Sequence, residues 1–178
     1  QMGVPCYDSK LLLKEAERHG ISQEIINEFK GKTSLLYAIG VMMSEESQDK
    51  KRLTIPEKMF HAQKETVKRL AQEGPCIFVG RCADYVLGDY SNVINTFIYA
   101  YKDDRLNRIM DIYKLTEKQA ADKIKKTDRE RKLYYEARTG REWGGIESNS
   151  MLFNTSLLGI DGVTDALEAI YRKWESRG

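Results

Sequence analysis

Residues 74–84 combine features that suit the binding of an anion. An unbroken apolar run, Cys76–Val79, is typical of a parallel strand that is buried on both faces. Gly80 lets the backbone turn, so that Arg81 follows the carboxyl end of this strand, where open α/β sheets bind their ligands. A guanidinium group in that place can hold a phosphate or a carboxylate with two hydrogen bonds. From the spacing alone, a surface arginine after a core strand explains the pattern equally well.

Two acidic residues and a serine have the chemistry to assist such a site. Asp84 follows the elbow and can orient Arg81 or accept hydrogen bonds from an amino-bearing base; the alternative is a local ion pair of little energetic value. Asp8 and Ser9 come directly after the first predicted strand and can accept from and donate to a small polar ligand. Taken alone, an Asp-Ser pair is better explained as a helix cap.

A basic helical segment is the third candidate. Its cations are Lys123, Lys125, Lys126, Arg129, Arg131 and Lys132. Most such runs are solvated helix faces. This one precedes a glycine-containing loop, however, and that order resembles a lid that brings arginines over a transferring phosphoryl group and excludes water. Nucleic-acid binding is a rival use, which the interleaved acids and the lack of a known motif make weaker, so we expect no nucleic-acid partner.

Length, composition and net charge limit the classes of protein to which the chain can belong. The 178 residues are enough for one domain with a good core, and the formal net charge of +2 is too small to indicate nucleic acid or a membrane as the main partner. No apolar run approaches the roughly 20 residues that span a bilayer, and the first residues do not have the pattern of a signal peptide. We therefore expect a cytoplasmic protein that does not bind membranes.

The cysteines and histidines do not form a metal-binding pattern. Three cysteines are an odd number without a Cys-x-x-Cys spacing, which argues against a disulfide framework or a zinc site. Cys6 and Cys76 lie in apolar strand contexts and are expected to be core thiols. His19 and His61 lie far apart without an acidic cluster, so no metal site is predicted. The chain also has no G-x-x-x-x-G-K-[ST] loop that would cradle the phosphates of ATP.

These candidates depend on strands that alternate with helices. Apolar runs predict strands at Val4–Tyr7, Cys76–Val79, Val93–Tyr99 and Met151–Asn154. Caps and periodicity predict five helices in the first half of the chain: from Asp8 or Ser9 to Gly20, at 22–31, at 34–43, from Pro56 to Gly74, and at 83–87. Three more are predicted in the second half. One begins at Asp103 or Asp104, one begins at Thr116 with Gln119 in a capping box and ends where Tyr134 and Tyr135 lead out of it, and one lies around 163–174. The polar stretch 44–52 is expected to be an exposed loop or a helix extension. This order predicts a mainly parallel sheet with helices on both faces.

Six segments of the chain together resemble the cytidylate kinase-like family of P-loop nucleoside monophosphate kinases. They are VPCYDSK at 4–10, GPCIFVGRCAD at 74–84, NVINTFIYA at 92–100, KKTDRERKLYY at 125–135, TGREWG at 139–144 and NTSLLGI at 154–160. The resemblance covers essentially the whole chain. Its most specific pieces are the Gly-Arg-Cys-Ala-Asp elbow and the later Tyr-Tyr, Thr-Gly and Trp-Gly pairs.

The resemblance implies an α/β fold of the three-layer P-loop kinase type, with a parallel sheet of strand order 2-3-1-4-5. It implies one nucleoside monophosphate kinase-like domain over residues 1–178, with a helical acceptor-side insert at about 21–73 and a lid at about 128–145. The first strand and the phosphate-binding loop of the family would precede residue 1. That strand would lie between the strands predicted at 76–79 and 93–99.

The resemblance also implies an activity. Related enzymes transfer the γ-phosphoryl group of ATP, with Mg2+, to CMP or dCMP, so small-molecule nucleotides are the expected partners. A kinase of the same fold with a different small acceptor, and a non-catalytic nucleotide-binding or regulatory module, remain alternatives. The family often carries aspartate where this chain has Asn154, which leaves the acceptor base open. The sequence predicts no oligomeric state.

The resemblance assigns four residues to the acceptor nucleotide. Asp8 and Ser9 would contact the nucleotide itself. Arg81 would bind its phosphate, and Asp84 would support that site. The elbow and the end of the first predicted strand are therefore expected at one pocket.

Five further residues are assigned to the lid and to the last strand. Arg129 and Arg131 would be the catalytic lid arginines. Asn154 and Thr155 would flank the site at the end of the last strand, and Arg105 is a weaker candidate in the helix that follows the strand at 93–99.

Overall fold

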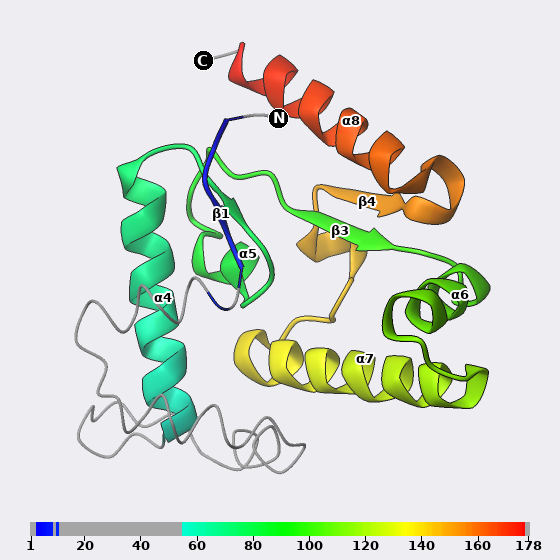
Figure 1. The fold of residues 1–178 in the computed structure, drawn as a ribbon. Coiled ribbons are helices and arrows are strands. Elements are labelled where there is room, and N and C mark those ends of the chain that lie inside the picture. Colours follow the sequence, from blue (N-terminus) through cyan, green and yellow to red (C-terminus); the bar gives the residue numbers. More distant parts are fainter. Residues whose placement is uncertain (1–2, 9, 11–54, 177–178) are drawn as a thin grey trace. The chain divides into compact units, whose positions relative to one another are not determined.

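The structure, a computed structural model, describes residues 3–8, 10 and 55–176 (Figure 1). The helices predicted to end at Gly20, Gly31 and Met43, and the polar stretch after them, lie outside the described residues. The elements in chain order are β1 (Cys6–Tyr7), α4 (Ile55–Glu73), β2 (Ile77–Phe78), α5 (Ala83–Val86), β3 (Thr96–Tyr99), α6 (Lys102–Tyr113), α7 (Glu117–Thr139), η1 (Ile146–Ser148), β4 (Met151–Asn154) and α8 (Thr155–Glu175). The fold is thus mixed α/β, with mostly helices and short parallel strands.

The chain divides into two compact units. The first, here called the elbow unit, consists of Val4–Val93 and Glu130–Trp143. The second, here called the β3–β4 unit, consists of Gln1–Gly3, Ile94–Arg129 and Gly144–Gly178. Helix α7 contributes residues to both units. Among the described residues, no helix is long and apolar enough to cross a membrane.

The sheet of the elbow unit is a parallel pair, β1 with β2. Its register places Cys6 opposite Ile77 and Tyr7 opposite Phe78. The backbone N–H of Val79 donates to the carbonyl oxygen of Tyr7 at 2.9 Å, so the pairing continues to the last residue before the elbow. The rings of Tyr7 and Phe78 stack, with their centroids 5.6 Å apart. The two strand ends therefore lie side by side.

Helix α4 covers this pair with an apolar stripe. The core of the unit consists of Val67, Leu70, Ala83, Val86 and Leu87, with Tyr7, Ala71, Phe78, Tyr90 and Val93 packed against it. Residues three or four apart on a helix share a face, which is why α4 presents Val67 and Leu70 together. This core anchors both the strand that enters the elbow and the helix that leaves it.

The β3–β4 unit contains the second parallel pair. Its register runs from Thr96 opposite Met151 to Tyr99 opposite Asn154. Helix α8 begins directly after β4 and contains one non-helical residue, Gly159. In the predicted order 2-3-1-4-5, strands 2 and 3 are neighbours, and so are strands 4 and 5. The pairs β1–β2 and β3–β4 correspond to these neighbours when the family's first strand is counted before β1. The complete order and the position of that first strand stay predictions.

Two expectations about helix α6 and helix α7 need correction. The N-cap position of helix α6 is Tyr101, which makes no side-chain cap hydrogen bond, and Asp103 and Asp104 lie inside the first turn instead of capping it. There they complement the positive end of the helix dipole. Helix α7 does not end before the tyrosine pair but continues to Thr139. The capping box at its start is confirmed, since the backbone N–H of Thr116 donates to the side chain of Gln119 at 2.9 Å.

The expectation about the cysteines was wrong. Cys6 is exposed and Cys76 is half-buried, whereas Cys82 in the elbow is buried. An apolar neighbourhood in the sequence did not identify the buried thiol, because burial at Cys82 comes from elements that pack onto the elbow. The strand predicted from Val93 begins three residues later, at Thr96.

Candidate functional site

The elbow after β2 has an unusual backbone. Three consecutive residues have positive φ angles: Gly80 at 71°, Arg81 at 60° and Cys82 at 56°. For a residue with a side chain, the left-handed conformation is disfavoured by about 1–2 kcal/mol. Helix α5 starts at Ala83, immediately after this turn. Strain of this kind persists where surrounding structure holds it, and it concentrates at functional sites.

The side chain of Arg81 lies against helix α7. Its guanidinium carbon is 5.8 Å from the centroid of the Tyr134 ring, a distance at which a cation is attracted to an aromatic face. The hydroxyl of Tyr134 donates to Oε1 of Gln63 on α4 at 3.0 Å. Gln63 is almost fully buried. Helix α4 thus fixes the tyrosine on which Arg81 rests.

The carboxylate of Asp84 is held by the neighbouring tyrosine. The hydroxyl of Tyr135 donates to its Oδ2 at 2.5 Å, and Tyr135 is buried. Two successive tyrosines of α7 therefore contact the two charged residues of the elbow. We name Arg81, Asp84, Tyr134, Tyr135 and Gln63 the elbow cluster.

Burial dominates the electrostatics of the elbow cluster. Burial, together with the negative charge of Asp84, raises the pKa of the Cys82 thiol to about 12. Burial also raises the pKa of Tyr134 to about 12, with Cys82 as the second cause. Arg81 and Arg138 oppose both shifts, because positive charges stabilise the anionic forms. At neutral pH both groups are therefore protonated, and neither serves as an anion.

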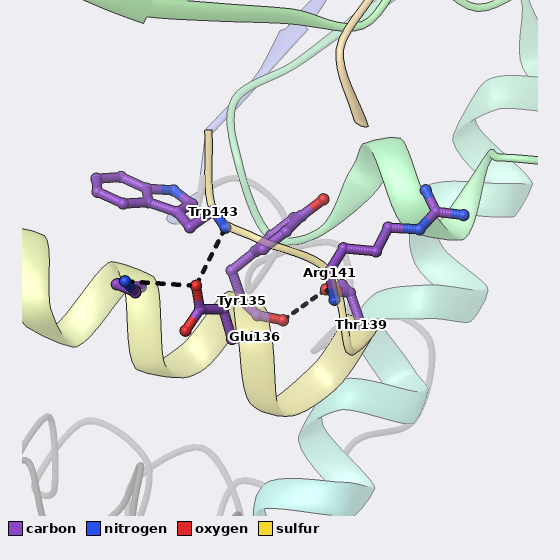
Figure 2. A network of polar contacts seen from close by, with 6 residues as sticks. Tyr135, Glu136, Thr139, Arg141 and Trp143 are labelled. Carbon is purple, nitrogen blue, oxygen red and sulfur yellow. Dashed lines mark hydrogen bonds and ion pairs between the residues drawn. The ribbon is translucent and has the colours of Figure 1, made fainter. Parts of the chain in front are cut away.

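The end of α7 is braced by polar contacts (Figure 2). Oε1 of Glu136 accepts the backbone N–H of Trp143 at 3.3 Å and pairs with Lys132 at 3.8 Å. The hydroxyl of Thr139 donates to the carbonyl oxygen of Tyr135 at 2.8 Å and accepts the backbone N–H of Arg141 at 3.1 Å. These contacts set the turn that follows α7.

Asp8 lies at the same edge of the elbow unit as the elbow. It follows β1, whose parallel partner β2 leads into Arg81. Its Oδ1 accepts the backbone N–H of Lys10 at 2.9 Å, the short-range bond of a capping aspartate. Ser9 lies outside the described residues.

The predicted residues of the β3–β4 unit contact other residues of the same unit. Oδ1 of Asn154 accepts the backbone N–H of Ser156 at 2.9 Å and so caps α8. The hydroxyl of Thr155 donates to the carbonyl oxygen of Tyr99 at 3.1 Å. Arg105 forms an ion pair with Asp128, with Nη2 and Oδ1 2.7 Å apart.

Two arginines are predicted to act from a lid. Arg129 and Arg131 are exposed on α7. Their assignment to a lid, like the other site assignments, stays a prediction. No group of three His, Cys, Asp or Glu side chains that could hold a metal ion occurs in the described ranges.

Sequence reasoning missed how Gln63 takes part in the elbow cluster. It lies four residues after Met59 and four before Val67, in the apolar stripe of α4. A polar residue in such a stripe needs a buried partner, and this is the signal that marks it. The tyrosine pair is visible in the sequence as a motif, but its two partners are set by packing.

Comparisons with known proteins agree on the kind of fold. A family model described as the cytidylate kinase-like family matches residues 1–157. A crystal structure of an uncharacterized protein from Eubacterium ventriosum ATCC 27560 superposes with a TM-score of 0.69 and 23% sequence identity, covering 97% of this chain and 84% of that chain. At this identity the likeness shows a shared fold alone. No curated protein matches the sequence.

Proposed function

We propose, since this chain belongs to the cytidylate kinase-like family, that it is a phosphotransferase that moves the γ-phosphoryl group of Mg-ATP to CMP or dCMP. The family supports a kinase-like function with small nucleotide ligands. The acceptor CMP or dCMP, the phosphoryl donor Mg-ATP and the roles of the residues are parts of our proposal. A cytoplasmic location is part of it.

The observation that carries the proposal is the geometry of the elbow cluster. An arginine fixed at the carboxyl end of a parallel strand has the position and the donor geometry to bind the phosphate of a nucleotide. Arg81 is held there by a strained turn and by the ring of Tyr134. A pre-positioned guanidinium group loses little side-chain entropy on binding, which favours affinity.

Asp84 has a supporting role in this proposal. Its carboxylate is oriented by Tyr135 and lies three residues after Arg81. An ionised carboxylate accepts hydrogen bonds only, so it suits the exocyclic amino group of a cytosine base. Asp8, at the neighbouring strand end, is proposed to contact the same nucleotide, and Ser9 is proposed beside it.

Transfer itself would depend on charge and position rather than on a covalent enzyme intermediate. In-line phosphoryl transfer is accelerated mainly by holding the reactants and neutralising charge. Arg129 and Arg131 are proposed to supply that charge from a lid at about 128–145. Arg105, Asn154 and Thr155 are proposed at the acceptor side.

ATP and Mg2+ rest on the family alone. The chain contains no G-x-x-x-x-G-K-[ST] loop, and the described residues include no three-ligand metal group. Mg2+ at such sites is usually held by one or two carboxylates together with substrate phosphates. The described residues therefore do not identify its ligands.

A panel of nucleoside monophosphates tests the proposal. Each is titrated into the protein by calorimetry, and ADP formation with Mg-ATP is followed in parallel. We expect CMP or dCMP to bind most tightly and to be phosphorylated. Phosphorylation of another monophosphate or of a small alcohol would identify a different acceptor. Binding of CMP without ADP formation would indicate the non-catalytic nucleotide-binding module instead.

A further inference from the structure

A buried hydrogen bond joins helix α4 to helix α7 beside the elbow. The hydroxyl of Tyr134 donates to Oε1 of Gln63 at 3.0 Å. Only 1% of Gln63 is exposed, and it lies in the apolar stripe of α4 between Met59 and Val67. A buried amide needs a hydrogen-bond partner, whereas an apolar side chain would fill this position without that need. Packing alone therefore does not explain a glutamine here.

The hydroxyl of Tyr134 has a second neighbour, the guanidinium group of Arg81. Burial is the main cause that raises the pKa of Tyr134 to about 12, and Arg81 opposes it through its charge and through a side-chain hydrogen bond. The guanidinium carbon is 5.8 Å from the centroid of the same ring. Arginine has only N–H donors, so the phenolic oxygen is the acceptor in this contact.

The hydroxyl of Tyr134 thus has a defined direction. A phenol offers one O–H and, on the same oxygen, lone pairs that accept hydrogen bonds. Since the O–H points to Gln63, the lone pairs are left for Arg81. Without an acceptor at this position of α4, the O–H is free to turn toward the guanidinium group, and two donors would then face each other. The carbonyl oxygen of Gln63 therefore sets which end of the hydroxyl dipole the cation meets.

A second contact holds α4 and α7 together one helical turn away. The guanidinium carbon of Arg138 is 5.1 Å from the centroid of the Phe60 ring. Arg138 lies four residues after Tyr134, and Phe60 lies three residues before Gln63, so each pair shares one face of its helix. The two helices are therefore joined at two successive turns, which keeps the hydroxyl of Tyr134 within reach of Gln63.

We propose that Gln63 is a positioning residue that acts through the hydroxyl of Tyr134 to fix the orientation in which Arg81 receives the phosphate of the acceptor nucleotide. This rests on the proposed function, and Gln63 itself does not touch the ligand. A guanidinium group has several N–H donors, so the contact with the phenol leaves donors for a phosphate. A side chain that is ordered before binding loses less entropy on binding. The affinity for the phosphate, and not for the nucleoside, therefore depends on Gln63.

Calorimetric titrations of CMP, cytidine and inorganic phosphate test this role. Gln63→Met removes the acceptor at similar volume, and Tyr134→Phe removes the hydroxyl but keeps the ring. We expect each substitution to weaken CMP binding by roughly three- to tenfold, the factor for one hydrogen bond, and to leave cytidine binding unchanged. Each should also lower the melting temperature, because it leaves one buried polar group without its partner.

The double variant Gln63→Met with Tyr134→Phe separates positioning from stability. Replacement of both partners by apolar groups of similar shape can be nearly neutral for stability, so its melting temperature should return toward that of the wild type. Its CMP binding should stay as weak as in Tyr134→Phe, since Gln63 acts only through that hydroxyl. An affinity that recovers together with the melting temperature would make the hydrogen bond structural and overturn the proposal. Losses of affinity that multiply in the double variant would overturn it as well.

Thr66→Val is the matched control on the same helix. Thr66 is also a buried polar residue of α4, but its hydroxyl donates to the carbonyl oxygen of Ala62 in its own helix at 2.8 Å. This variant should bind CMP within about twofold of the wild type. A loss of CMP affinity as large as that in Gln63→Met would assign the effect to a general disturbance of α4 and overturn the proposal.

The outcomes separate this inference from the proposed function. If the wild type binds CMP and Gln63→Met binds it equally well, Gln63 is not a positioning residue and the proposed function stands. Gln63-dependent binding of inorganic phosphate without binding of any nucleoside monophosphate would keep the positioning role and overturn the proposed function. Binding of none of the three probes by the wild type would overturn both.

Discussion

The two strand ends of the molecule use their polar residues differently. After β4, Asn154 and Thr155 bond to backbone groups of Ser156 and Tyr99 at the start of helix α8. After β2, the backbone passes through three left-handed residues. There Asp84 meets a side chain 51 residues later in the chain.

The difference distinguishes a residue that caps a helix from residues that are held together at a candidate binding site. The Asn154 cap satisfies a backbone N–H that the helix itself leaves unpaired, so this hydrogen bond needs only a residue two positions away. The elbow instead holds charged groups in a strained backbone by contacts with a distant helix. A strained, tertiary-dependent arrangement is the stronger candidate for function.

The largest effect is expected from a glycine of the β3–β4 unit. Gly144 has φ +77°, and a Cβ added there would be 2.9 Å from the Phe97 ring. Gly80 has φ +71°, with no atom within 4 Å of an added Cβ. Gly144→Ala should therefore lower the free energy of unfolding by about 2–4 kcal/mol, through strain and overpacking.

Gly80→Ala is the matched control and should lower the free energy of unfolding by about 1–2 kcal/mol, from strain alone. Urea denaturation followed by circular dichroism measures both variants. Equal losses would mean that the Phe97 ring moves aside without cost. A larger loss in Gly80→Ala would show that the elbow is more constrained than its open surroundings indicate.

Removal of the elbow cation tests whether the elbow is the binding region. Arg81→Ala should weaken CMP binding by roughly 1.5–3 kcal/mol, the range for a hydrogen bond to a charged group. Arg105→Ala is the comparison in the β3–β4 unit, where the arginine is paired with Asp128. Its effect on CMP affinity should be smaller, as calorimetry would show. Unchanged affinity in Arg81→Ala for CMP and for all rival monophosphates would remove Arg81 from the site.

The capping residue after β4 gives a smaller effect. Asn154→Ala removes the acceptor of the Ser156 N–H and should lower the free energy of unfolding by about 1 kcal/mol. Asn154→Asp keeps the acceptor and should retain most of the stability. If Asn154→Asp keeps its stability but changes the preference among nucleoside monophosphates, this strand end reads the base as well, and the contrast between the two regions weakens.

The last effect concerns pH and is absent at neutral pH. The pKa of the Cys82 thiol is raised to about 12 from 9.0. Above pH 9 the unfolded chain loses this proton while the folded chain keeps it, so stability falls between pH 9 and about 12 and is unaffected below. Cys82→Ala should flatten the pH dependence of the melting temperature in this range. Melting curves of both proteins that stay parallel from pH 8 to 11 would contradict the burial of this thiol.

Local features of the fold could be predicted from the sequence. The strand Met151–Asn154 and the capping box of Thr116 and Gln119 were predicted correctly. Both are set by side chains only a few residues apart, through apolar runs and i,i+3 hydrogen bonds. The family motifs were recognisable for the same reason, because each occupies a short segment.

Tertiary contacts determine several features that short sequence segments do not predict. The N-cap position of α6 is Tyr101, whose backbone N–H donates to the hydroxyl of Ser156, 55 residues away. The buried thiol is Cys82 and not Cys6. The partners of Arg81 and Asp84 are likewise chosen by packing of α7 against the elbow. Sequence by itself determined which residues carry charge and where three of the four predicted strands end. Only the folded chain determined which distant side chains hold the charged residues, because those contacts depend on how helices pack.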